Sequence, residues 1–588
     1  MKDPNQILAF NDPWHDSSFC LYGDQIVHIE SERYTRVKYE PVNPILTFCE
    51  LFPEKINDFG CIVFEESPNA VASFARHLIR ARLHGASPAA SYTAMPYGTE
   101  LARESGSAVI EKTDRVKEFI EHLLRPEIEI FFAGHHASHA ANAFFSSGFE
   151  SALTVTLDGI GHDYLLDGSG RTLTTVGTDS PTHRINGSVF RCEGRRCTPV
   201  HHVTDCSIGF AWSRVAEHVM GRGLGEEGTV MAMAALGDAR HYRRDLAEPW
   251  VWLPTPDGDL DPTSSAGLQA CLARLRQSLT TEQDRFDLAA ALQEASEIRF
   301  RDLLARFIRP GDRDLCLAGG TMLNCQMVGK VMTWFPDLRR VFIPPAPYDG
   351  GICIGAAQLV FHGEKGFPVQ WNAGLPPFAM GAEYSRLSVV GACRSARVNT
   401  TEATSEEALA LLAQGKVLGW FSGAAESGRR ALGHRSILAD PRIGGMKERL
   451  NAQIKHRQWY RPFAPMVLAE EVSSWFECGS DFRSPYMSFA IQVRPECRHR
   501  VPAIIHLDGS ARVQTVHREL NPGLHAILSQ WHAISGVPML LNTSFNEREP
   551  IVESPTDALN TMNRAHLDGI FFADVGILAT PRSDVLSH

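Results

Sequence analysis

Two well-separated segments of this sequence repeat one order of strand-like and turn-like stretches. Residues 7–34 read ILAF, a polar NDPWHDSS, FCLY, a GDQ turn and IVHIESERY, and residues 151–178 read SALTVTL, DGIGHD, YLL, DGSG and TLTTVGT. In each segment an acidic turn, with Asp12 or Asp158, follows the first strand. Helical stretches follow both, so the pattern predicts a duplicated α/β fold. The alternative is that hairpin signals recur by chance in a long α/β chain.

The length of the chain predicts more than one domain. A chain of 588 residues is too long for a single hydrophobic core. Residues 362–385 are rich in Gly and Pro and lack periodicity, which is typical of a linker. We expect a second domain from about residue 386, with strands at VLGWFS, HAISGVPMLLN and GIFFA and a helix at SEEALALLAQG.

Charge and cysteine usage exclude several classes of protein. The formal net charge of −11 argues against a general nucleic-acid binder. The 13 cysteines are scattered and form no C-x-x-C pair, which favours a reducing compartment over a disulfide framework or a zinc finger. The opening apolar run ILAF is too short for a secretory signal, and no stretch is long enough to span a bilayer. We therefore expect a cytoplasmic protein with no membrane partner.

The stretch AGHHASHAANAFF, residues 133–145, places three histidines within five residues. In a helix, His135 and His139 share one face, whereas His136 points about 100° away. Asp158 ends a predicted strand just downstream, and a His, His, Asp set suits a divalent transition metal. The residues between His135 and His139 do not give H-E-x-x-H, which disfavours a metalloprotease. The alternative is an ordinary helix whose histidines bind no metal.

His15 lies in the predicted turn after the first strand, between Asp12 and Asp16. A histidine with neighbouring carboxylates at such a position is a candidate general base. A solvated turn histidine is the alternative.

Residues 429–461 reverse the charge of the chain locally. They hold nine Lys or Arg against two acids, Asp440 and Glu448, and the arginines alternate with apolar stretches. Arginine forks suit phosphate oxygens, so we favour a small phosphorylated ligand over nucleic acid. A solvated basic face is the alternative. The Gly319–Gly320 turn after a buried strand could also approach a phosphate, although such a turn alone is weak support.

The chain also carries a long ordered set of motifs. In sequence order these are WHDSS, ESERYTRVK, HHASHAANAFF with LDGIG, LAGGTMLNC, PPAPYDGG, GRRALGHRSILADPR, IKHRQWYRPFAP, DGSARVQTV and LNTSFNEREPIV. The set resembles the NodU/CmcH-type O-carbamoyltransferases, and the resemblance runs across essentially the whole chain.

The resemblance implies an N-terminal duplicated actin-like (ASKHA, Kae1-like) domain at residues 1–365 and a C-terminal YrdC-like α/β domain at residues 386–588. The YrdC-like domain would make carbamoyl adenylate from carbamoyl phosphate and ATP, with Mg²⁺. The Kae1-like domain would then transfer the carbamoyl group to a hydroxyl of a small-molecule acceptor. Family members carbamoylate antibiotics and nodulation factors, so a natural-product acceptor is expected. A monomer and a homodimer are both left open.

By motif match, the resemblance also assigns residues. Fe²⁺ or another divalent transition metal would be held by His135, His139, Asp158 and Asp349, with His136 left out. His15 would deprotonate the acceptor hydroxyl, and Lys38 would stabilise the carbamoyl oxygen. The nucleotide side of the first domain would be formed by Gly319, Gly320 and Asn324. Carbamoyl phosphate and ATP in the second domain would be bound by Arg430, Arg435, Lys455, Arg457, Arg461, Arg512, Ser544 and Asn546.

The sequence departs from the family pattern at two positions. Arg429 stands where the family usually has proline, and Thr229 stands where it usually has lysine in a Glu-Gly-Lys-x-Met block. The second change puts any contact of that lysine with substrate or nucleotide in doubt.

Two other functions remain as alternatives. A threonylcarbamoyl-type transferase acting on tRNA uses related domains, but the acidic net charge counts against it. A non-catalytic sensor of ATP or carbamoyl phosphate is disfavoured by the intact histidine, aspartate and arginine positions.

Overall fold

The computed structural model describes residues 3–11, 16–38, 44–52, 59–65, 129–161, 164–166, 172–175, 185–223, 225–253, 266–369 and 378–582. The protein is a mixed α/β structure that divides into two compact units. The first unit comprises Met1–Thr35, Tyr39–Asn324 and Val331–Pro376, and the second comprises Arg36–Lys38, Cys325–Lys330 and Pro377–His588. The assignment of residues 1–365 and 386–588 to Kae1-like and YrdC-like domains stays a prediction.

The first unit contains one sheet of seven strands and one of five, and five consecutive strands of the first follow the same plan as the second. The first sheet has the order β3 (Val27–Glu30), β2 (Ser18–Tyr22), β1 (Asp3–Phe10), β4 (Phe59–Glu65), β5 (Glu129–Ala133). The second has the order β10 (Arg196–Val203), β9 (Ile185–Glu193), β6 (Ser151–Gly161), β11 (Asp314–Ala318), β12 (Arg340–Phe342). In both, three strands form an antiparallel meander, and two further strands add in parallel beside the first strand of that meander.

The second meander was predicted at the wrong place. The first four residues of DGIGHD do not form a turn, because β6 continues through Asp158 to Gly161, where a register shift between Leu157 and Gly161 interrupts the pairing. The stretches predicted as its partners become β7 (Tyr164–Leu166) and β8 (Thr172–Thr175), which extend the first sheet beside β5. The meander is completed instead by β9 and β10, which are joined at Gly194 with a φ of 58°.

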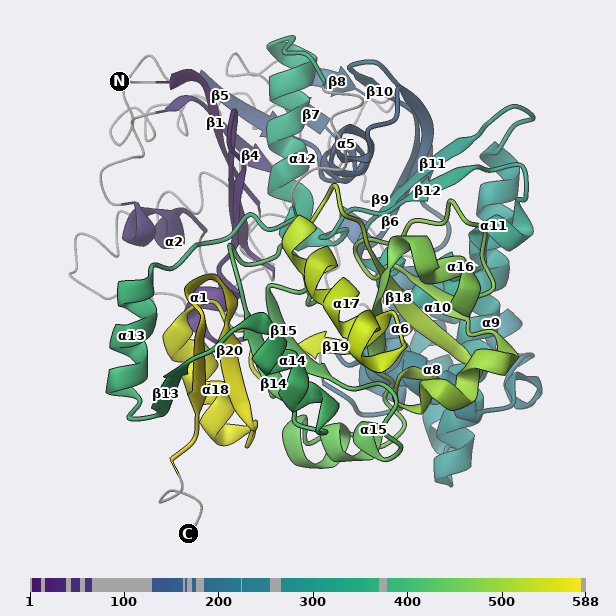
Figure 1. Ribbon diagram of the computed structural model, residues 1–588. Helices are drawn as coiled ribbons and strands as arrows, with labels where there is room; N and C mark the ends of the chain where they lie inside the picture. Colours follow the sequence, from purple (N-terminus) through teal and green to yellow (C-terminus); the bar gives the residue numbers. More distant parts are fainter. Residues whose placement is uncertain are drawn as a thin grey trace, which may run out of the picture. The chain divides into compact units, whose positions relative to one another are not determined.

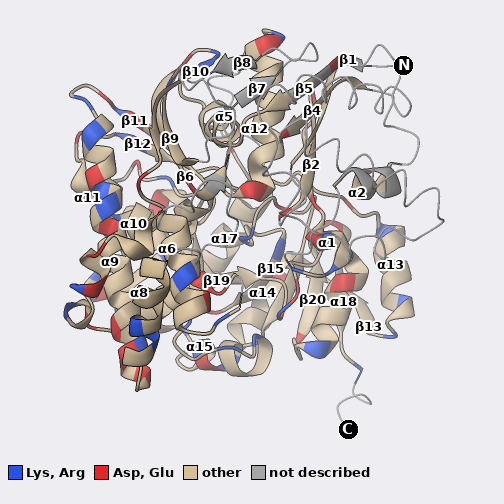
Figure 2. Cartoon of the chain, turned by 180° about the vertical axis from the view of Figure 1, so that it is seen from behind, with Lys and Arg blue, Asp and Glu red and all other residues tan. Residues whose placement is uncertain are grey.

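Two helices pack against each other between the sheets of the first unit (Figure 1). Helix α5 (His135–Ser147) lies against β6 and β11, and α12 (Ile352–Gln358) lies against β1, β2 and β4. Their approach is close enough that a Cβ on Gly355 would lie 1.8 Å from the carbonyl oxygen of Ser138. Alanines fill much of α5 and it carries no charged Lys, Arg, Asp or Glu side chain (Figure 2), which suits a helix buried on all sides.

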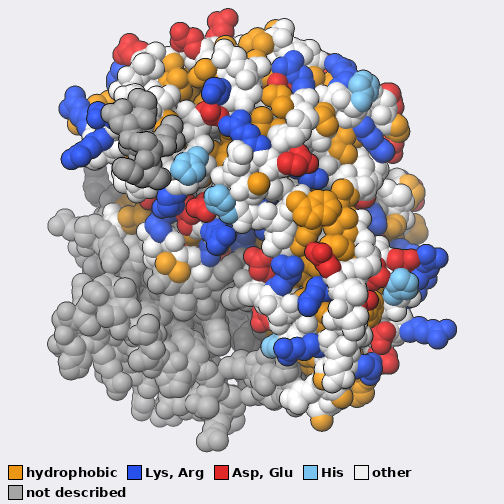
Figure 3. All heavy atoms as spheres, turned by 90° about the horizontal axis from the view of Figure 1, so that it is seen from below, with side chains coloured by type: hydrophobic (Ala, Val, Ile, Leu, Met, Phe, Trp, Pro, Cys, Tyr) orange, Lys and Arg blue, Asp and Glu red, His pale blue; other side chains and the backbone are white. Residues whose placement is uncertain are grey.

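The remaining helices of the first unit surround these layers. They include α1 (Glu32–Thr35), α2 (Pro44–Leu51), α6 (Ile208–Arg214), α7 (Glu227–Met233), α8 (Ala266–Ser278), α9 (Glu282–Phe307) and α11 (Val331–Trp334). Within the described part of the chain, no helix has the length and apolar character needed to cross a bilayer. Figure 3 shows acidic and basic side chains interleaved on one face of the described residues, in agreement with the mixed composition of the chain.

The second unit is built on one large sheet. Its order is β13 (Asn399–Glu402), β21 (Ile577–Thr580), β20 (Gly569–Phe572), β14 (Leu418–Phe421), β15 (Arg435–Ala439), β19 (Met539–Ser544), β16 (Ala464–Leu468), β18 (Ser510–Val516), β17 (Phe489–Gln492). Helices α14 (Ser405–Ala413) and α17 (Pro522–Ser535) share one hydrophobic core with Trp420. Helices α13 (Arg386–Ser395) and α18 (Pro555–Arg564) contribute to another, with Phe421. Neighbouring strand residues point to opposite faces, so helices cover both faces of the sheet.

Most of the elements expected in the second domain are confirmed. VLGWFS contains β14, GIFFA contains β20, and SEEALALLAQG contains α14, which a capping box between Thr404 and Glu407 begins. HAISGVPMLLN was predicted as one strand, but its first four residues end α17. Gly536 terminates that helix in the left-handed conformation, and β19 starts only at Met539.

Two short segments from early parts of the sequence belong to the second unit. Arg36 has a φ of 64°, and its guanidinium donates to the carbonyl oxygens of Pro550 and Ile551, each at 2.8 Å. Helix α10 (Cys325–Gly329) packs against β17, and Gln326 donates to the Ser510 hydroxyl at 3.2 Å. These contacts place both segments firmly in the second unit.

Candidate metal centre

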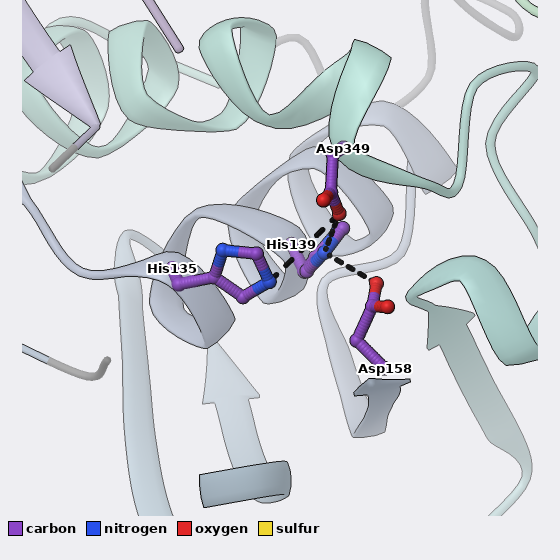
Figure 4. A group of neighbouring side chains, drawn as sticks. All are labelled: His135, His139, Asp158 and Asp349. Carbon is purple, nitrogen blue, oxygen red and sulfur yellow. Dashed lines mark ion pairs between the residues drawn. The ribbon is translucent and has the colours of Figure 1, made fainter. Parts of the chain in front are cut away.

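Four predicted ligands come together in the first unit (Figure 4). His135 and His139 lie one turn apart at the start of α5, Asp158 lies in β6, and Asp349 opens the turn Asp349–Gly351 that precedes α12. One candidate ligand atom from each residue lies within 4.8 Å of all the others. The α5–α12 packing and the neighbouring strand β6 therefore gather side chains that are distant in sequence.

The donor set fits a divalent transition metal. His139 Nε2 lies 3.2 Å from Asp158 Oδ2 and 3.4 Å from Asp349 Oδ1, and His135 Nε2 lies 3.8 Å from the same Asp349 oxygen. The Nε2 atoms of both imidazoles are buried, and neither makes an aligned hydrogen bond in the described structure. Two imidazole nitrogens and two carboxylates that converge in this way match the nitrogen and oxygen ligands of such ions.

Backbone groups hold the Asp158 carboxylate in place. The Gly159 amide donates to Oδ1 at 2.6 Å, and the Gly320 amide donates to Oδ2 at 2.8 Å. Gly319, at a φ of 95°, makes the turn that aims the Gly320 amide, and a Cβ there would lie 2.0 Å from the Leu157 carbonyl oxygen. The Gly319–Gly320 turn, predicted on the nucleotide side, is thus also a direct support of the metal centre.

Sequence reasoning missed Glu65, which orients His135. The register of β4 on β5 pairs Glu65 with Ala133, two residues before His135. The Nδ1–H of His135 donates to Glu65 Oε1 at 3.0 Å, which fixes the tautomer that leaves Nε2 open to a metal. Glu65 could have been found, because it is a carboxylate at the end of a buried strand, the same signal that pointed to Asp158.

The carboxylates also set the protonation of the histidines. Burial alone lowers the pKa of His135, but the hydrogen bond to Glu65 and the charges of Asp349 and Asp158 outweigh it and raise the pKa to about 10. The pKa of His139 is raised as well: burial lowers it, and the contacts with Asp158 and Asp349 raise it. The site therefore stabilises positive charge. Without a metal ion, protonated histidines carry that charge, and a bound metal ion would take their place.

His136 is engaged elsewhere, as its helical position predicted. Its Nδ1 lies 3.1 Å from the Thr156 hydroxyl, and its Nε2 lies 3.0 Å from the Ile185 carbonyl oxygen. Burial, reinforced by the charges of His135 and His139, lowers the pKa of His136 well below its usual value. A neutral imidazole with both nitrogens in use fits a structural role in the core.

The other residues predicted for the first domain have separate positions. His15 lies outside the described residues. The side-chain amide of Asn324 pairs reciprocally with that of Gln293, at 2.9 and 3.2 Å. Lys38 is exposed and belongs to the second unit, where its charge contributes to lowering the pKa of Lys455, after burial and Arg457. Thr229, at the position of the family lysine, is buried and donates to Glu226 at 2.6 Å.

The second unit gathers several of the predicted phosphate-binding residues. Lys455 is buried, and its ammonium donates to the carbonyl oxygens of Ser544 and Asn546 and to the Asn546 side chain, at 2.5 to 2.8 Å. Burial, the charge of Arg457 and then that of Lys38 lower the pKa of Lys455 well below its usual value. Burial and the charges of Arg461 and Arg512 lower the pKa of Arg457 well below its usual value. We call Lys455, Arg457, Arg461 and Arg512 the cationic cluster.

Arg430 and Arg512 act on the same neighbouring group, the Cys325 thiol. Burial raises the pKa of the Cys325 thiol, whereas the charges of Arg512 and Arg430 act in the opposite direction. Cys325 therefore lies within electrostatic reach of both arginines, in the same unit.

Arg435, predicted to bind carbamoyl phosphate or ATP, is fully buried and bonded to protein in the structure, so its ligand-binding role stays a prediction. Its side chain is 0% exposed, and its guanidinium donates to the carbonyl oxygens of Glu553, Ser422, Gly423, His434 and Ala382. It also lies 3.6 Å from the centre of the Phe421 ring. Arg435 therefore ties together chain segments within the second unit, and its Nε and both of its NH₂ groups already bind protein.

Family models match both parts of the chain. The model described as carbamoyltransferase N-terminus matches residues 6–246 and 268–358, and the model described as carbamoyltransferase C-terminus matches residues 409–578. The chain belongs to the carbamoyltransferase family. This confirms the predicted family and identifies the protein as a carbamoyltransferase enzyme.

Two similar proteins are nodulation proteins of rhizobia. The carbamoyltransferase is 32% identical to nodulation protein NolNO of Sinorhizobium fredii, over 95% of its own chain and 78% of that protein. It is 35% identical to nodulation protein NolO of Bradyrhizobium diazoefficiens, over 76% of its chain and 79% of that protein.

Two solved structures show a distant similarity to this chain. Component A of the (R)-2-hydroxyglutaryl-CoA dehydratase of Acidaminococcus fermentans aligns at 11% identity with a TM-score of 0.32, over 61% of this chain and 99% of that one. HypF of T. kodakarensis aligns at 13% identity with a TM-score of 0.30, over 61% of this chain and 48% of that one. Both TM-scores are too low to support a conclusion about fold or function.

Replacing ligand and non-ligand histidines tests the metal centre of the carbamoyltransferase. We expect His135→Ala to abolish metal binding, because it removes an imidazole that converges on Asp349. His136→Gln should keep full metal content, since both nitrogens of His136 are engaged with Thr156 and Ile185 and not with the candidate ligands. Metal per folded chain, measured by elemental mass spectrometry, checks both. Stoichiometric metal in His135→Ala, or its loss in folded His136→Gln, would contradict the assignment.

The metal-free carbamoyltransferase should lose stability as pH rises. The folded-state pKa of His135, about 10, lies above its usual 6.5, so charged His135 stabilises the fold fully below pH 6.5, and this contribution is lost as pH rises through about 10. Glu65→Gln keeps a hydrogen-bond acceptor but removes the charge, so the fall should shrink. Chemical denaturation of the metal-free protein across this pH range measures it. Equal pH dependence in both proteins would exclude the proposed effect of Glu65.

Proposed function

We propose that this carbamoyltransferase is ATP-dependent and acts on a hydroxyl of a small-molecule natural product. Carbamoyl phosphate and water give carbamate and phosphate, and carbamate attacks ATP to give carbamoyl adenylate and pyrophosphate. The acceptor oxygen then bonds to the carbamoyl carbon, AMP leaves, and the hydroxyl proton passes to a base. The mixed anhydride supplies a good leaving group, which carbamate alone lacks.

The observation that carries this proposal is the cationic cluster of the second unit. Burial and mutual repulsion lower the pKa values of Lys455 and Arg457, so the cluster holds positive charges that destabilise one another. A phosphate or pyrophosphate group would relieve this repulsion through charge-assisted hydrogen bonds. Ser544 and Asn546, which Lys455 contacts, add hydroxyl and amide groups at the same place. We therefore assign adenylate formation, with ATP, Mg²⁺ and carbamoyl phosphate, to this unit.

Carbamoyl transfer is assigned to the first unit. The shared order and polarity of its two sheets support a duplicated actin-like, Kae1-like fold, and the second unit would be the YrdC-like domain. His135, His139, Asp158 and Asp349 would hold Fe²⁺ or another divalent transition metal, which when bound would act as a Lewis acid toward phosphate oxygens. Gly319, Gly320 and Asn324 would lie on the nucleotide side.

Two more residues complete the proposed transfer step. His15 would accept the proton of the acceptor hydroxyl as it attacks. Lys38 would offset negative charge that develops on the carbamoyl oxygen, and its proximity to Lys455 connects it with the unit in which the adenylate forms. A cytoplasmic location and the absence of a nucleic-acid partner are parts of the same proposal.

Product analysis tests the proposed function directly. Incubation of the metal-loaded protein with ATP, Mg²⁺ and carbamoyl phosphate should release pyrophosphate, and adding candidate hydroxylated natural products should give carbamoylated products and AMP by mass spectrometry. Omission of carbamoyl phosphate is the control. Pyrophosphate release that does not depend on carbamoyl phosphate, or no release at all, would rule out the adenylate route.

The division of labour between the units makes a separate prediction. Arg461→Ala should slow carbamoyl phosphate-dependent pyrophosphate release about 10- to 100-fold, the size expected for losing a charged hydrogen bond. Transfer from supplied carbamoyl adenylate should continue. Arg394→Ala, an exposed arginine of α13, is the matched control and should leave both steps unchanged. An Arg461→Ala protein that fails only in transfer would reverse the assignment.

A further inference from the structure

The turn that carries Asp349 is held by three buried polar side chains that lie in the first sheet or directly beside it. Asn11 Nδ2 donates to the Asp349 carbonyl oxygen at 3.0 Å, and the Ser18 hydroxyl donates to the Gly350 carbonyl oxygen at 2.9 Å. His28 Nε2 lies 2.5 Å from the same Gly350 oxygen. The three side chains are 4%, 0% and 3% exposed, and they lie beside the apolar core of the first sheet. Polar groups at such positions need a specific reason.

Both the nitrogen and the oxygen of the Asn11 side-chain amide are hydrogen-bonded. Besides the bond to Asp349, its Nδ2 donates to the Asp16 carbonyl oxygen at 2.9 Å, and its Oδ1 accepts from the Ser18 amide at 2.6 Å. A carboxamide supplies two donors and an acceptor in one plane, which a carboxylate or a hydroxyl cannot do. Asn11 therefore joins the Asp349 turn to the chain that leads into β2.

The rest of the turn is anchored from two other sides. The Tyr348 hydroxyl donates to Glu30 Oε2 at 2.8 Å. From α5, Asn142 Nδ2 donates to the carbonyl oxygens of Ala346 and Gly351, at 3.0 and 3.1 Å. The backbone from residue 346 to residue 351 is thus fixed to both β-strands and helix.

The glycines that follow Asp349 explain why anchoring is needed. A Cβ on Gly351 would lie 2.0 Å from the Ala346 carbonyl oxygen, and one on Gly350 would lie 2.7 Å from the Tyr348 ring. Side chains are therefore excluded at both positions. Two consecutive glycines allow more backbone conformations than any other pair, so the ligand carboxylate next to them would be poorly positioned without external contacts.

We propose that Asn11, Ser18 and His28 are positioning residues of the metal centre. By fixing the carbonyl groups of Asp349 and Gly350, they set the position of the Asp349 carboxylate and so the affinity for the metal. This inference rests on the metal-binding part of the proposed function and on none of its carbamoyl chemistry. If these side chains only satisfied buried carbonyl groups, their loss would lower stability without a selective effect on metal affinity.

Cobalt binding to the full-length, metal-free protein tests the inference. Competition with a chromophoric chelator gives the Kd for Co²⁺, and the visible spectrum of the Co²⁺ complex reports the ligand geometry. Ser18→Ala and His28→Leu should each weaken Co²⁺ binding roughly 10- to 100-fold, the effect typical of groups that support metal ligands, and alter the spectrum. His28→Gln, which keeps a donor, should recover most of the affinity. Ser147→Ala removes another buried hydroxyl, at the far end of α5, and should leave the Kd unchanged.

The outcomes separate this inference from the proposed reaction. Co²⁺ affinity equal to wild type in folded Ser18→Ala and His28→Leu overturns the positioning role, as does an equal loss in His28→Leu and His28→Gln. A wild-type protein that binds no Co²⁺ overturns the role together with the metal centre. Carbamoyl phosphate-dependent pyrophosphate release is assigned to the second unit, so its absence contradicts the reaction and leaves the Co²⁺ comparison intact.

Discussion

The close contact between α5 and α12 is the constraint on which the first unit depends. Gly355 lies so near the Ser138 carbonyl oxygen that no side chain fits between the helices. Because each helix also packs on a different sheet, this one contact brings strands from both sheets to a common place. His135 and His139 enter from one helix, and Asp349 enters from the turn before the other. A larger residue at position 355 would separate the ligands as well as the helices.

Local charge shifts the pKa values of buried basic groups in opposite directions in the two units. In the first unit, Glu65, Asp158 and Asp349 surround two imidazoles and raise their pKa values, which prepares the site for a cation. In the second unit, burial and neighbouring cations lower the pKa values of Lys455 and Arg457, which prepares the cationic cluster for an anion. That contrast agrees with a metal in one unit and phosphate-containing substrates in the other.

Local patterns predicted some features well and others poorly. The spacing of His135 and His139 sufficed to separate them from His136, because helical periodicity fixes which side chains share a face. Asp349 came only from family resemblance, since nothing near it in sequence relates it to α5. The DGIG stretch was taken for a turn because its composition is that of a turn, but pairing with β9 extends the strand through it. The sequence does not show that Arg435 is fully buried and donates to backbone carbonyl oxygens, because those contacts come from segments distant in the chain.

The second unit includes Arg36–Lys38 and Cys325–Lys330, which affects the order in which the chain can fold. During synthesis, these segments emerge from the ribosome long before Pro550, Ile551 and Ser510, to which they bind. These early segments therefore cannot take their places in the second unit until the last part of the polypeptide has been made. A single cut between residues 376 and 377 would likewise deprive the second unit of Lys38 and Gln326. The second unit of the carbamoyltransferase is therefore built from three separate stretches of the sequence, so the two halves of the chain are not independent modules.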